Sequence, residues 1–381
     1  MKGYFHKRGS KWAFTIDVGK DPETGKRKQK ALSGFKTKKE AEKACAKLIM
    51  ELENGEYIEE TKTTFGAFIN DWLQLVAKPT LRPTTYAGYE SAVRSRLIPA
   101  FKNRKLVDIK PIHVMRFYSS LLDEGITEEF VQYLHSILKN SFRTAIKWEL
   151  LKQNIMDKVE PPSRKRKQLR VWTLEEAISF LEAAKETRQH FYMTYVLAIF
   201  TGMRRGEILA LKWTDCMLDE GKISVNKSLS FVKGHGIVCQ EAKTGSSNRV
   251  ISISDMIVEE LRKHRLQQQK MKLMLGEAYQ DNGYVIAKET GEPVNPNYIF
   301  NHFKKLLGKV DVPPIRFHDL RHTHATIMLK LGEHPKVVSE RLGHSNIQMT
   351  MNVYSHVTLD MQKESSDRFE QAFQAAKRKT M

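Results

Sequence analysis

The sequence predicts a multidomain, mainly α-helical protein with a small β-sheet-plus-helix unit at its N-terminus. The chain has 381 residues, more than one compact core usually holds, so two or three domains are expected. Apolar residues recur at helical spacing over most of the chain, whereas strand-like patterns are confined to residues 1–39 and 222–254. Residues 55–63 and 160–167 have the composition of linkers.

The first predicted unit, residues 1–55, is a three-stranded sheet with one helix. Apolar side chains alternate along residues 11–18, which predicts a half-buried strand with Phe14 in the core. An Asp-Pro-Glu-Thr-Gly turn then leads into a returning strand. Thr37 and Glu40 have the spacing of a capping box, so a helix is expected to begin there.

The second predicted unit, residues 64–160, contains four helices. The apolar residues that mark the first helix are Phe65, Phe68, Ile69, Trp72 and Leu75. A proline-containing turn leads into the second helix, and residues 114–124 and 130–147 supply the other two.

The third predicted unit, residues 168–381, mixes α and β structure but is mostly helical. A helix opens at Thr173, and short strands are expected at residues 223–225, 236–238 and 249–253. The C-terminal tail carries Met361, Phe369, Phe373 and Ala376 at helical spacing. It is expected to pack either on its own domain or on a neighbouring protomer, and the spacing does not choose between them.

The charge balance favours a polyanionic partner. Lys and Arg number 63 against 44 Asp and Glu, for a formal net charge of +19. A membrane partner is disfavoured because no apolar run approaches the roughly 20 residues of a transmembrane helix and the N-terminus has no signal-peptide core. Three widely spaced cysteines do not predict a disulfide framework or a zinc finger. We therefore expect a cytoplasmic protein that works on DNA.

Basic residues outside the third unit are candidates for phosphate contacts, although each alone is more often an ordinary surface charge. The candidates are Lys7, Arg8, Lys26, Arg27, Lys28, Arg82, Arg94, Arg96, Lys139, Arg143, Arg164, Lys165, Arg166 and Lys167. The last four are consecutive, and two prolines before them stiffen the segment.

The most informative pattern is an ordered set of cations and histidines closed by a tyrosine. Its members are Arg204, Lys243, His318, Arg321, His344 and Tyr354. Arginine, lysine and histidine side chains can donate hydrogen bonds to a phosphate, and a tyrosine hydroxyl can attack one. Together they indicate phosphoryl transfer on DNA without a metal ion.

Two alternatives concern single members of this set. His318 and His322 have the i, i+4 spacing of a zinc-protease helix, but Asp319 replaces the glutamate base and Arg321 would place a cation beside the metal, so no metal site is predicted. Lys243 is expected in the turn of a hairpin between two strands. Lys233 is a second lysine in the same strand region.

The complete set resembles the catalytic residues of the tyrosine recombinases, the integrase family of phages and conjugative transposons. The motifs are TGxRxxE from residue 201, HxLRHT from residue 318, LGH from residue 342, and Tyr354. The resemblance implies an arm-type DNA-binding domain in residues 1–55, a core-binding domain in 64–160 and a catalytic domain in 168–381.

The resemblance also implies a mechanism. Tyr354 would attack a phosphodiester to give a 3′-phosphotyrosyl link; Arg204 and Arg321 would bind the non-bridging oxygens; His318 would assist proton transfer, His344 would hydrogen-bond a phosphate oxygen and Lys243 would protonate the leaving 5′-oxygen. No cofactor is required. Four such sites imply a homotetramer on double-stranded core and arm-type attachment sites, assisted by DNA-bending and directionality factors.

The resulting interpretation is a site-specific integrase that inserts or excises a mobile element or prophage in a bacterial host. A type IB topoisomerase or a chromosome-dimer resolvase would share the tyrosine chemistry, but the basic N-terminal unit disfavours the resolvase. A catalytically silent DNA-binding regulator on the same scaffold is the alternative from another functional class.

Overall fold

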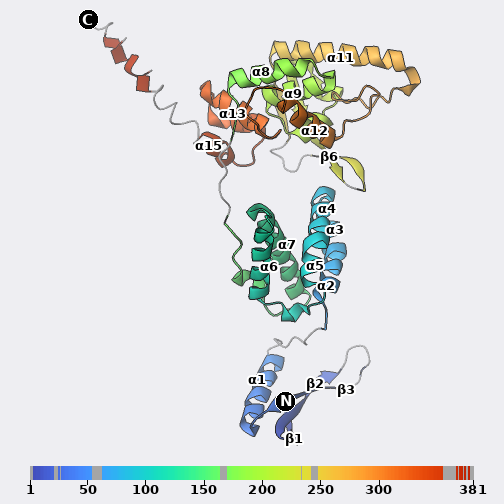
Figure 1. Cartoon of the computed structure of the whole chain (residues 1–381), viewed down its shortest axis with the longest axis vertical. Coiled ribbons are helices and arrows are strands. Elements are labelled where there is room, and N and C mark those ends of the chain that lie inside the picture. Colours follow the sequence, from blue (N-terminus) through green and yellow to red (C-terminus); the bar gives the residue numbers. More distant parts are fainter. Residues whose placement is uncertain are drawn as a thin grey trace. The chain divides into compact units, whose positions relative to one another are not determined.

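The computed structural model describes residues 3–20, 25, 27–53, 62–163, 170–232, 234–241, 248–354, 366–367, 369–371, 373–374 and 376–377. The chain forms two compact units, Met1–Lys165 and Arg166–Met381 (Figure 1). Within the described ranges, no helix has the length and apolar character needed to cross a membrane.

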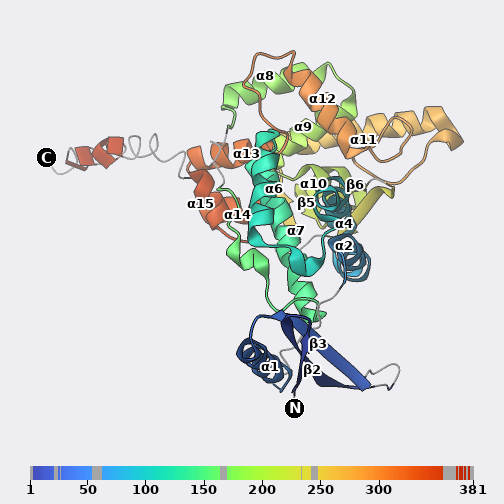
Figure 2. The ribbon, with the colours of Figure 1, turned by 60° about the horizontal axis from the view of Figure 1, so that its bottom comes forward.

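The first unit begins with an antiparallel sheet of order β1-β2-β3 and a helix packed on one face (Figure 2). Its elements are β1 (Gly3–Arg8), β2 (Lys11–Lys20), β3 (Arg27–Phe35) and α1 (Lys38–Glu53). The sheet and helix share a small core that includes Phe14, Ile16 and Leu48. The predicted sheet-plus-helix arrangement is therefore confirmed, while residues 21–24 of the predicted turn lie outside the described residues.

The helix cap at Thr37 differs from the predicted box in one bond. The Thr37 hydroxyl accepts a hydrogen bond from the Glu40 N–H at 3.2 Å, as expected. The Glu40 carboxylate accepts from the N–H of Lys36 at 2.9 Å. The bond to the Glu40 carboxylate therefore satisfies the backbone N–H of Lys36, the residue before the cap, and not that of Thr37.

The rest of the first unit is a helical bundle. Its elements are α2 (Phe65–Trp72), η1 (Leu73–Ala77), α3 (Lys78–Thr80), α4 (Pro83–Ala92), η2 (Val93–Leu97), α5 (Ile98–Phe101), η3 (Leu106–Asp108), α6 (Pro111–Asp123), α7 (Glu128–Lys147) and η4 (Ile155–Lys158). Because α2, η1 and α3 are contiguous, as are α4, η2 and α5, the bundle contains the four long helical stretches that the sequence predicts.

Proline explains the wide π turns inside the first two stretches. The N–H of Lys78 donates to the carbonyl of Leu73, five residues earlier, and Pro79 follows. The widened turn accommodates a ring that would otherwise clash with a carbonyl of the preceding turn. It also shifts the helix phase, so the expectation that Leu75 belongs to the apolar face was wrong: Leu75 is 67% exposed, whereas Leu73 is buried.

The second unit packs helices and short strands around one large apolar core (Figure 1). Its helices are α8 (Leu174–Lys185), α9 (Gln189–Thr201), α10 (Arg205–Ala210), η5 (Trp213–Asp215), η6 (Leu218–Glu220), α11 (Asp255–Leu275), η8 (Gly276–Ala278), α12 (Pro296–Leu307), α13 (Asp319–Lys330), α14 (Pro335–Leu342) and α15 (Gln348–Tyr354). Aromatic side chains are central to the core: Trp172 and Phe180 lie with ring centroids 4.9 Å apart. Thr173 caps α8, as predicted.

The strands of the second unit form two separate sheets. One has the order β4-β5-β8, and the other is the hairpin β6-β7. The strands are β4 (Cys216–Met217), β5 (Lys222–Val225), β6 (Lys227–Val232), β7 (Gly236–Glu241) and β8 (Arg249–Ser252). The predicted hairpin around Lys243 was therefore wrong, because β7 pairs with β6 and β8 pairs with β5. The segment between β7 and β8 connects two sheets.

Gly206 allows α10 to lie directly on β6. A Cβ at this position would lie 2.8 Å from the backbone carbonyl oxygen of Leu229 and would also overlap the hydroxyl of Ser228. A backbone atom cannot move aside as a flexible side chain can. The close approach of α10 to β6 therefore requires glycine here.

Gly206→Ala should consequently lower the stability of the protein by about 1–3 kcal/mol, despite the better helix propensity of alanine. Thermal unfolding of the full chain measures the effect. Gly308→Ala is the matched control, because Gly308 has φ of −71° and the nearest neighbour of an added Cβ lies at 3.6 Å. Equal melting temperatures for the two variants would contradict the inferred contact.

Candidate active site

Arg204 stands between α9 and α10, at a sharp change of chain direction. Gly202 ends α9 with a left-handed conformation, φ of 65°, and a Cβ there would lie 2.5 Å from the Leu342 side chain. Arg204 is the N-cap of α10. Its side chain is about one-third exposed, so the guanidinium reaches the surface.

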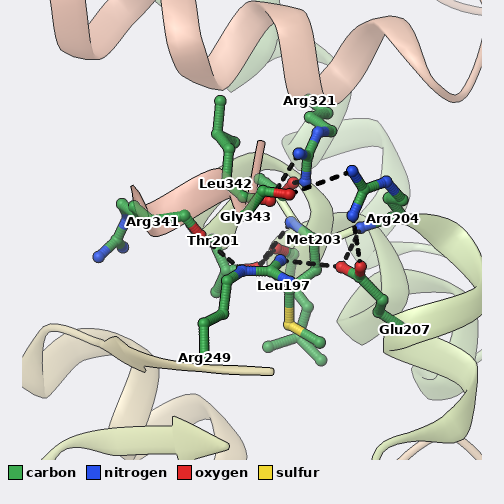
Figure 3. Close-up of polar contacts among 11 residues, drawn as sticks. Leu197, Thr201, Met203, Arg204, Glu207, Arg249, Arg321, Arg341, Leu342 and Gly343 are labelled. Atoms are coloured by element: carbon green, nitrogen blue, oxygen red, sulfur yellow. Dashed lines mark hydrogen bonds and ion pairs between the residues drawn. The ribbon is translucent and has the colours of Figure 1, made fainter. Parts of the chain in front are cut away.

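A buried carboxylate orients Arg204. The Glu207 side chain is 7% exposed, and its Oε1 accepts from Arg204 Nη1 at 2.7 Å. Its Oε2 accepts from the Arg204 backbone N–H at 2.9 Å and from Arg249 Nη2 at 2.8 Å (Figure 3). Burial raises the pKa of Glu207, but hydrogen bonds and charges from Arg249 and Arg204 outweigh it, so the pKa lies below its ordinary value. Glu207 is therefore ionised.

Arg321 lies beside Arg204 and is held by backbone carbonyls. It is the third residue of α13 and is only 2% exposed. Its Nη1 donates to the Gly202 carbonyl at 2.9 Å, and its Nη2 donates to the Leu342 carbonyl at 2.5 Å (Figure 3). Burial and then the charge of Arg204 lower the pKa of Arg321 to about 9, which leaves it protonated at neutral pH.

The two predicted histidines lie within the electrostatic influence of Arg204 and Arg321. His318 is the N-cap of α13, and His344 follows Gly343, the left-handed residue that ends α14. His344 Nδ1 lies 2.8 Å from the hydroxyl of Thr350, which is fully buried. That contact fixes the orientation of the imidazole.

Both histidines are neutral in the protein as it stands. Desolvation by the surrounding protein, then His322 and the nearby arginines, lower the pKa of His318 to about 4. Desolvation, then the charges of Arg321 and Arg204, lower the pKa of His344 to about 3. Because Arg321 and Arg204 affect the pKa of both histidines, the four side chains share one electrostatic environment.

Near His318 and His322, the described residues provide no third ligand for a zinc ion. The rings of His318 and His322 lie with centroids 5.2 Å apart and nearly perpendicular. Asp319 is occupied by Arg316, which donates to it from its backbone and from its guanidinium. Among the residues with described positions, no group of three or more His, Cys, Asp or Glu side chains could hold a metal ion.

Of the remaining two predicted residues, Tyr354 is described by its backbone alone. Tyr354 is the last residue of α15, and α15 packs on α13 and α14, the helices that carry Arg321 and precede His344. The Tyr354 side chain, Lys243 and its rival Lys233 lie outside the described residues. The structure thus brings four of the six predicted residues together and brings the Tyr354 backbone to a neighbouring helix.

At least half of the described candidate DNA contacts in the first unit pair with acidic residues. Arg27 pairs with Asp17, Arg94 with Glu90, Arg96 with Glu124, and Lys139 with Asp157. Lys7, Arg8 and Arg143 are exposed, Lys7 above the Trp12 ring, and Arg82 caps α4. The positions outside the described residues are Lys26, the Lys28 side chain, Arg164, Lys165, Arg166 and Lys167. Exposed ion pairs contribute little stability, so these cations can exchange partners at low cost.

Sequence reasoning missed the residues that support the arginines. Arg249 and Arg341 are both partly or fully buried and donate to backbone carbonyls of neighbouring elements. His324 donates from Nδ1 to the Ile199 carbonyl at 2.9 Å and accepts from Arg341 at 3.2 Å. Glu207 entered the sequence analysis only as the last residue of the TGxRxxE motif. Arg249 begins the strand predicted at residues 249–253, and that pattern gives no sign that its side chain is buried.

Comparisons with known proteins place this geometry in a family. Residues 169–360 match the phage integrase family, residues 64–122 the phage integrase N-terminal SAM-like domain, and residues 4–52 an arm DNA-binding domain. A tyrosine recombinase XerC-like protein of Caldanaerobacter subterraneus is 32% identical, over 90% of this chain and 91% of the relative. The ICEBs1 integrase of Bacillus subtilis is 28% identical, over 94% and 96%. The chain belongs to the phage integrase family of tyrosine recombinases.

Solved structures share the fold. The Tn1549 transposon integrase bound to transposon right end DNA aligns with a TM-score of 0.66 at 22% identity, covering 80% of this chain and 99% of that one. A lambda integrase tetramer bound to a Holliday junction aligns with a TM-score of 0.58 at 18% identity, covering 92% and 94%. The multidomain, mainly α-helical fold class predicted from the sequence is confirmed.

The buried His324 should make stability depend on pH. Burial and then Arg341 lower its pKa to about 4, against about 6.5 in an unfolded chain. Between these values the unfolded chain binds a proton that the folded protein does not, so the free energy of unfolding falls as pH falls. Above pH 6.5 the residue is neutral in both states and its contribution is constant.

His324→Asn should therefore be less stable than the wild type at pH 7.5. On acidification to pH 4 its free energy of unfolding should fall less than that of the wild type, by as much as roughly 3 kcal/mol. Urea unfolding at pH 7.5, 5.5 and 4.5 measures both effects. His235→Asn, in the exposed turn between β6 and β7, should keep the wild-type pH dependence. Retention of the full wild-type loss in His324→Asn would exclude His324 as its source.

Proposed function

We propose that this protein is an integrase that cuts and rejoins DNA at attachment sites through Tyr354, to insert or excise a mobile element or prophage. The observation that carries the proposal is the convergence of Arg204, Arg321, His318 and His344 at one desolvated site. Three chain segments far apart in sequence supply these side chains. The helix that ends at Tyr354 packs on two of the elements involved.

The two arginines would bind the non-bridging oxygens of the scissile phosphate. Arg204 presents a guanidinium at the surface, and Arg321 stands behind it with its orientation fixed by two carbonyls. As the Tyr354 oxygen attacks, negative charge on the phosphate oxygens grows. Fixed cations in a desolvated site stabilise that charge more than water does.

Proton transfer would use the histidines and the lysine. The Tyr354 hydroxyl loses its proton as the phosphorus–oxygen bond forms, and neutral His318 can accept it. The bond from phosphorus to the 5′-oxygen breaks, and Lys243 would protonate that oxygen. His344 would hydrogen-bond a phosphate oxygen through the nitrogen that does not face Thr350. The phosphotyrosyl link conserves the bond energy, so rejoining requires no ATP or added metal.

The domains would divide the DNA between them. Residues 1–55 would bind arm-type sites, residues 64–160 the core site, and residues 168–381 would perform catalysis; the matches to arm-binding and SAM-like domains support this division. The titles of the related structures describe complexes with DNA, and one describes a tetramer. We infer a homotetramer acting on chromosomal and element DNA in the bacterial cytoplasm, with DNA-bending and directionality factors as partners.

The tail supports contact with a neighbouring protomer. Phe369 and Phe373 are 74% and 65% exposed, which leaves two large apolar side chains available for an intermolecular contact.

The silent regulator is disfavoured, because a protein that only binds DNA has no need of a desolvated arginine pair beside a tyrosine-bearing helix.

Covalent chemistry tests the proposal directly. In EDTA, the wild-type protein incubated with a nicked suicide substrate carrying its element's attachment core should form a denaturation-resistant adduct. Tyr354→Phe should bind the same DNA with unchanged affinity and form none, because only the nucleophilic oxygen is removed. Gel electrophoresis in denaturant measures the adduct. An adduct in the variant would assign the nucleophile elsewhere, and none with the wild type would favour the regulator.

Deletion of residues 1–55 tests the domain assignment. The shortened protein should lose binding to distal arm DNA and keep cleavage of the core site, because the N-terminal sheet and helix have their own apolar core. Mobility-shift assays with separate arm and core duplexes, alongside the suicide substrate, measure both activities. Loss of core cleavage would contradict the assignment.

A further inference from the structure

We propose that Arg249, the first residue of β8, is a positioning residue for both phosphate-binding arginines; the inference rests on the function proposed above. Its side chain is 6% exposed, so it cannot itself reach a DNA phosphate without a rearrangement. Its Nη2 donates to Glu207 Oε2 at 2.8 Å, and its Nε donates to the Arg341 carbonyl at 2.7 Å (Figure 3). One guanidinium thus joins two segments of the site.

The first of these bonds controls Arg204. Glu207 grips Arg204 through both its guanidinium and its backbone N–H, and Arg249 neutralises and orients the same carboxylate from the opposite side. A buried carboxylate that loses one of two cationic partners is costly, and it relieves that cost by moving toward the other partner or toward water. Either movement displaces the Arg204 guanidinium.

The second bond controls the acceptors at the end of α14. The carbonyl of Arg341, which Arg249 holds, directly precedes the Leu342 carbonyl that accepts from Arg321. The next carbonyl, that of Gly343, lies 3.5 Å from Arg204 Nη2. Arg249 therefore fixes a run of three peptide groups against which both arginines are aligned. The same run leads into His344.

Geometry rather than charge distinguishes arginine from lysine here. The planar guanidinium places two donors in a fixed fork, one for the carboxylate and one for the carbonyl. A lysine ammonium retains the charge but holds both acceptors less rigidly. Arg249→Lys should therefore keep part of the function that Arg249→Met loses.

The test uses the full-length protein and a nicked core duplex with either a phosphodiester or a methylphosphonate at the scissile position. The methylphosphonate lacks one charged oxygen, so its cleavage depends less on correctly placed arginines. Arg249→Met should release the 5′-hydroxyl strand from the phosphodiester about 100-fold more slowly, with DNA affinity changed less than about threefold. On the methylphosphonate the defect should shrink to about tenfold or less. Arg249→Lys should lie between Arg249→Met and the wild type.

Arg262→Met is the matched control, because Arg262 lies exposed on α11 and pairs with an exposed aspartate. It should cleave both substrates at the wild-type rate. Equal slowing of the two substrates by Arg249→Met would indicate a general structural role and overturn the proposal, as would a wild-type rate. If Arg249→Met fails to fold, the substrate comparison with Arg249→Lys decides. Absence of cleavage by the wild type would instead refute the proposed function.

Discussion

The site depends on one buried carboxylate. Glu207 lies between Arg204 and Arg249, and each of its oxygens accepts at least one hydrogen bond from them. An isolated carboxylate at this depth would be protonated or hydrated, because desolvation disfavours the charged form. With two arginines it stays ionised and joins the beginning of α10 to the beginning of β8. The remaining contacts of the pocket are arranged around that connection.

Backbone carbonyls, rather than a carboxylate, accept the described hydrogen bonds of Arg321. Arg321 donates to the carbonyls of Gly202 and Leu342, which follow α9 and end α14. Carbonyl groups at helix ends have no partner inside the helix, so they are available acceptors with a partial negative charge. Left-handed glycines at 202 and 343 turn the chain immediately after each helix. The chain segments that end α9 and α14 therefore also provide the carbonyls that orient Arg321.

The sequence predicted what depends on local pattern and residue order. The N-terminal sheet and helix, the four helical stretches and the helix start at Thr173 follow from periodicity and capping residues. Strand pairing was not predictable in the same way, because β8 joins β5 across the intervening β6-β7 hairpin. The exposed Leu75 likewise depends on a π turn, which the 3.6-residue period does not describe.

The supporting residues of the site were hidden for a related reason. Arg249 and Arg341 act through carbonyl groups that any residue could provide, so no side-chain motif marks their partners. Only the fold brings β8, the end of α9 and the end of α14 to one place. Chemistry carried by side chains in a fixed order can be recognised in a sequence, whereas chemistry that uses the backbone of a distant segment cannot.

The balance of charge in the pocket explains why it is suited to a phosphate. Arg204, Arg249 and Arg321 converge there, and the Glu207 carboxylate binds the first two. Burial, and after it the charges of the neighbouring cations, lower the pKa of Arg321 and keep His318 and His344 neutral. Such a pocket costs folding stability, a cost commonly found at functional sites. In the proposed reaction a phosphodiester would supply the opposing negative charge, and further charge would develop on its oxygens as the tyrosine attacks. The arrangement is therefore more favourable with the reacting phosphate bound than without it, which is the condition for catalysis by electrostatic preorganisation.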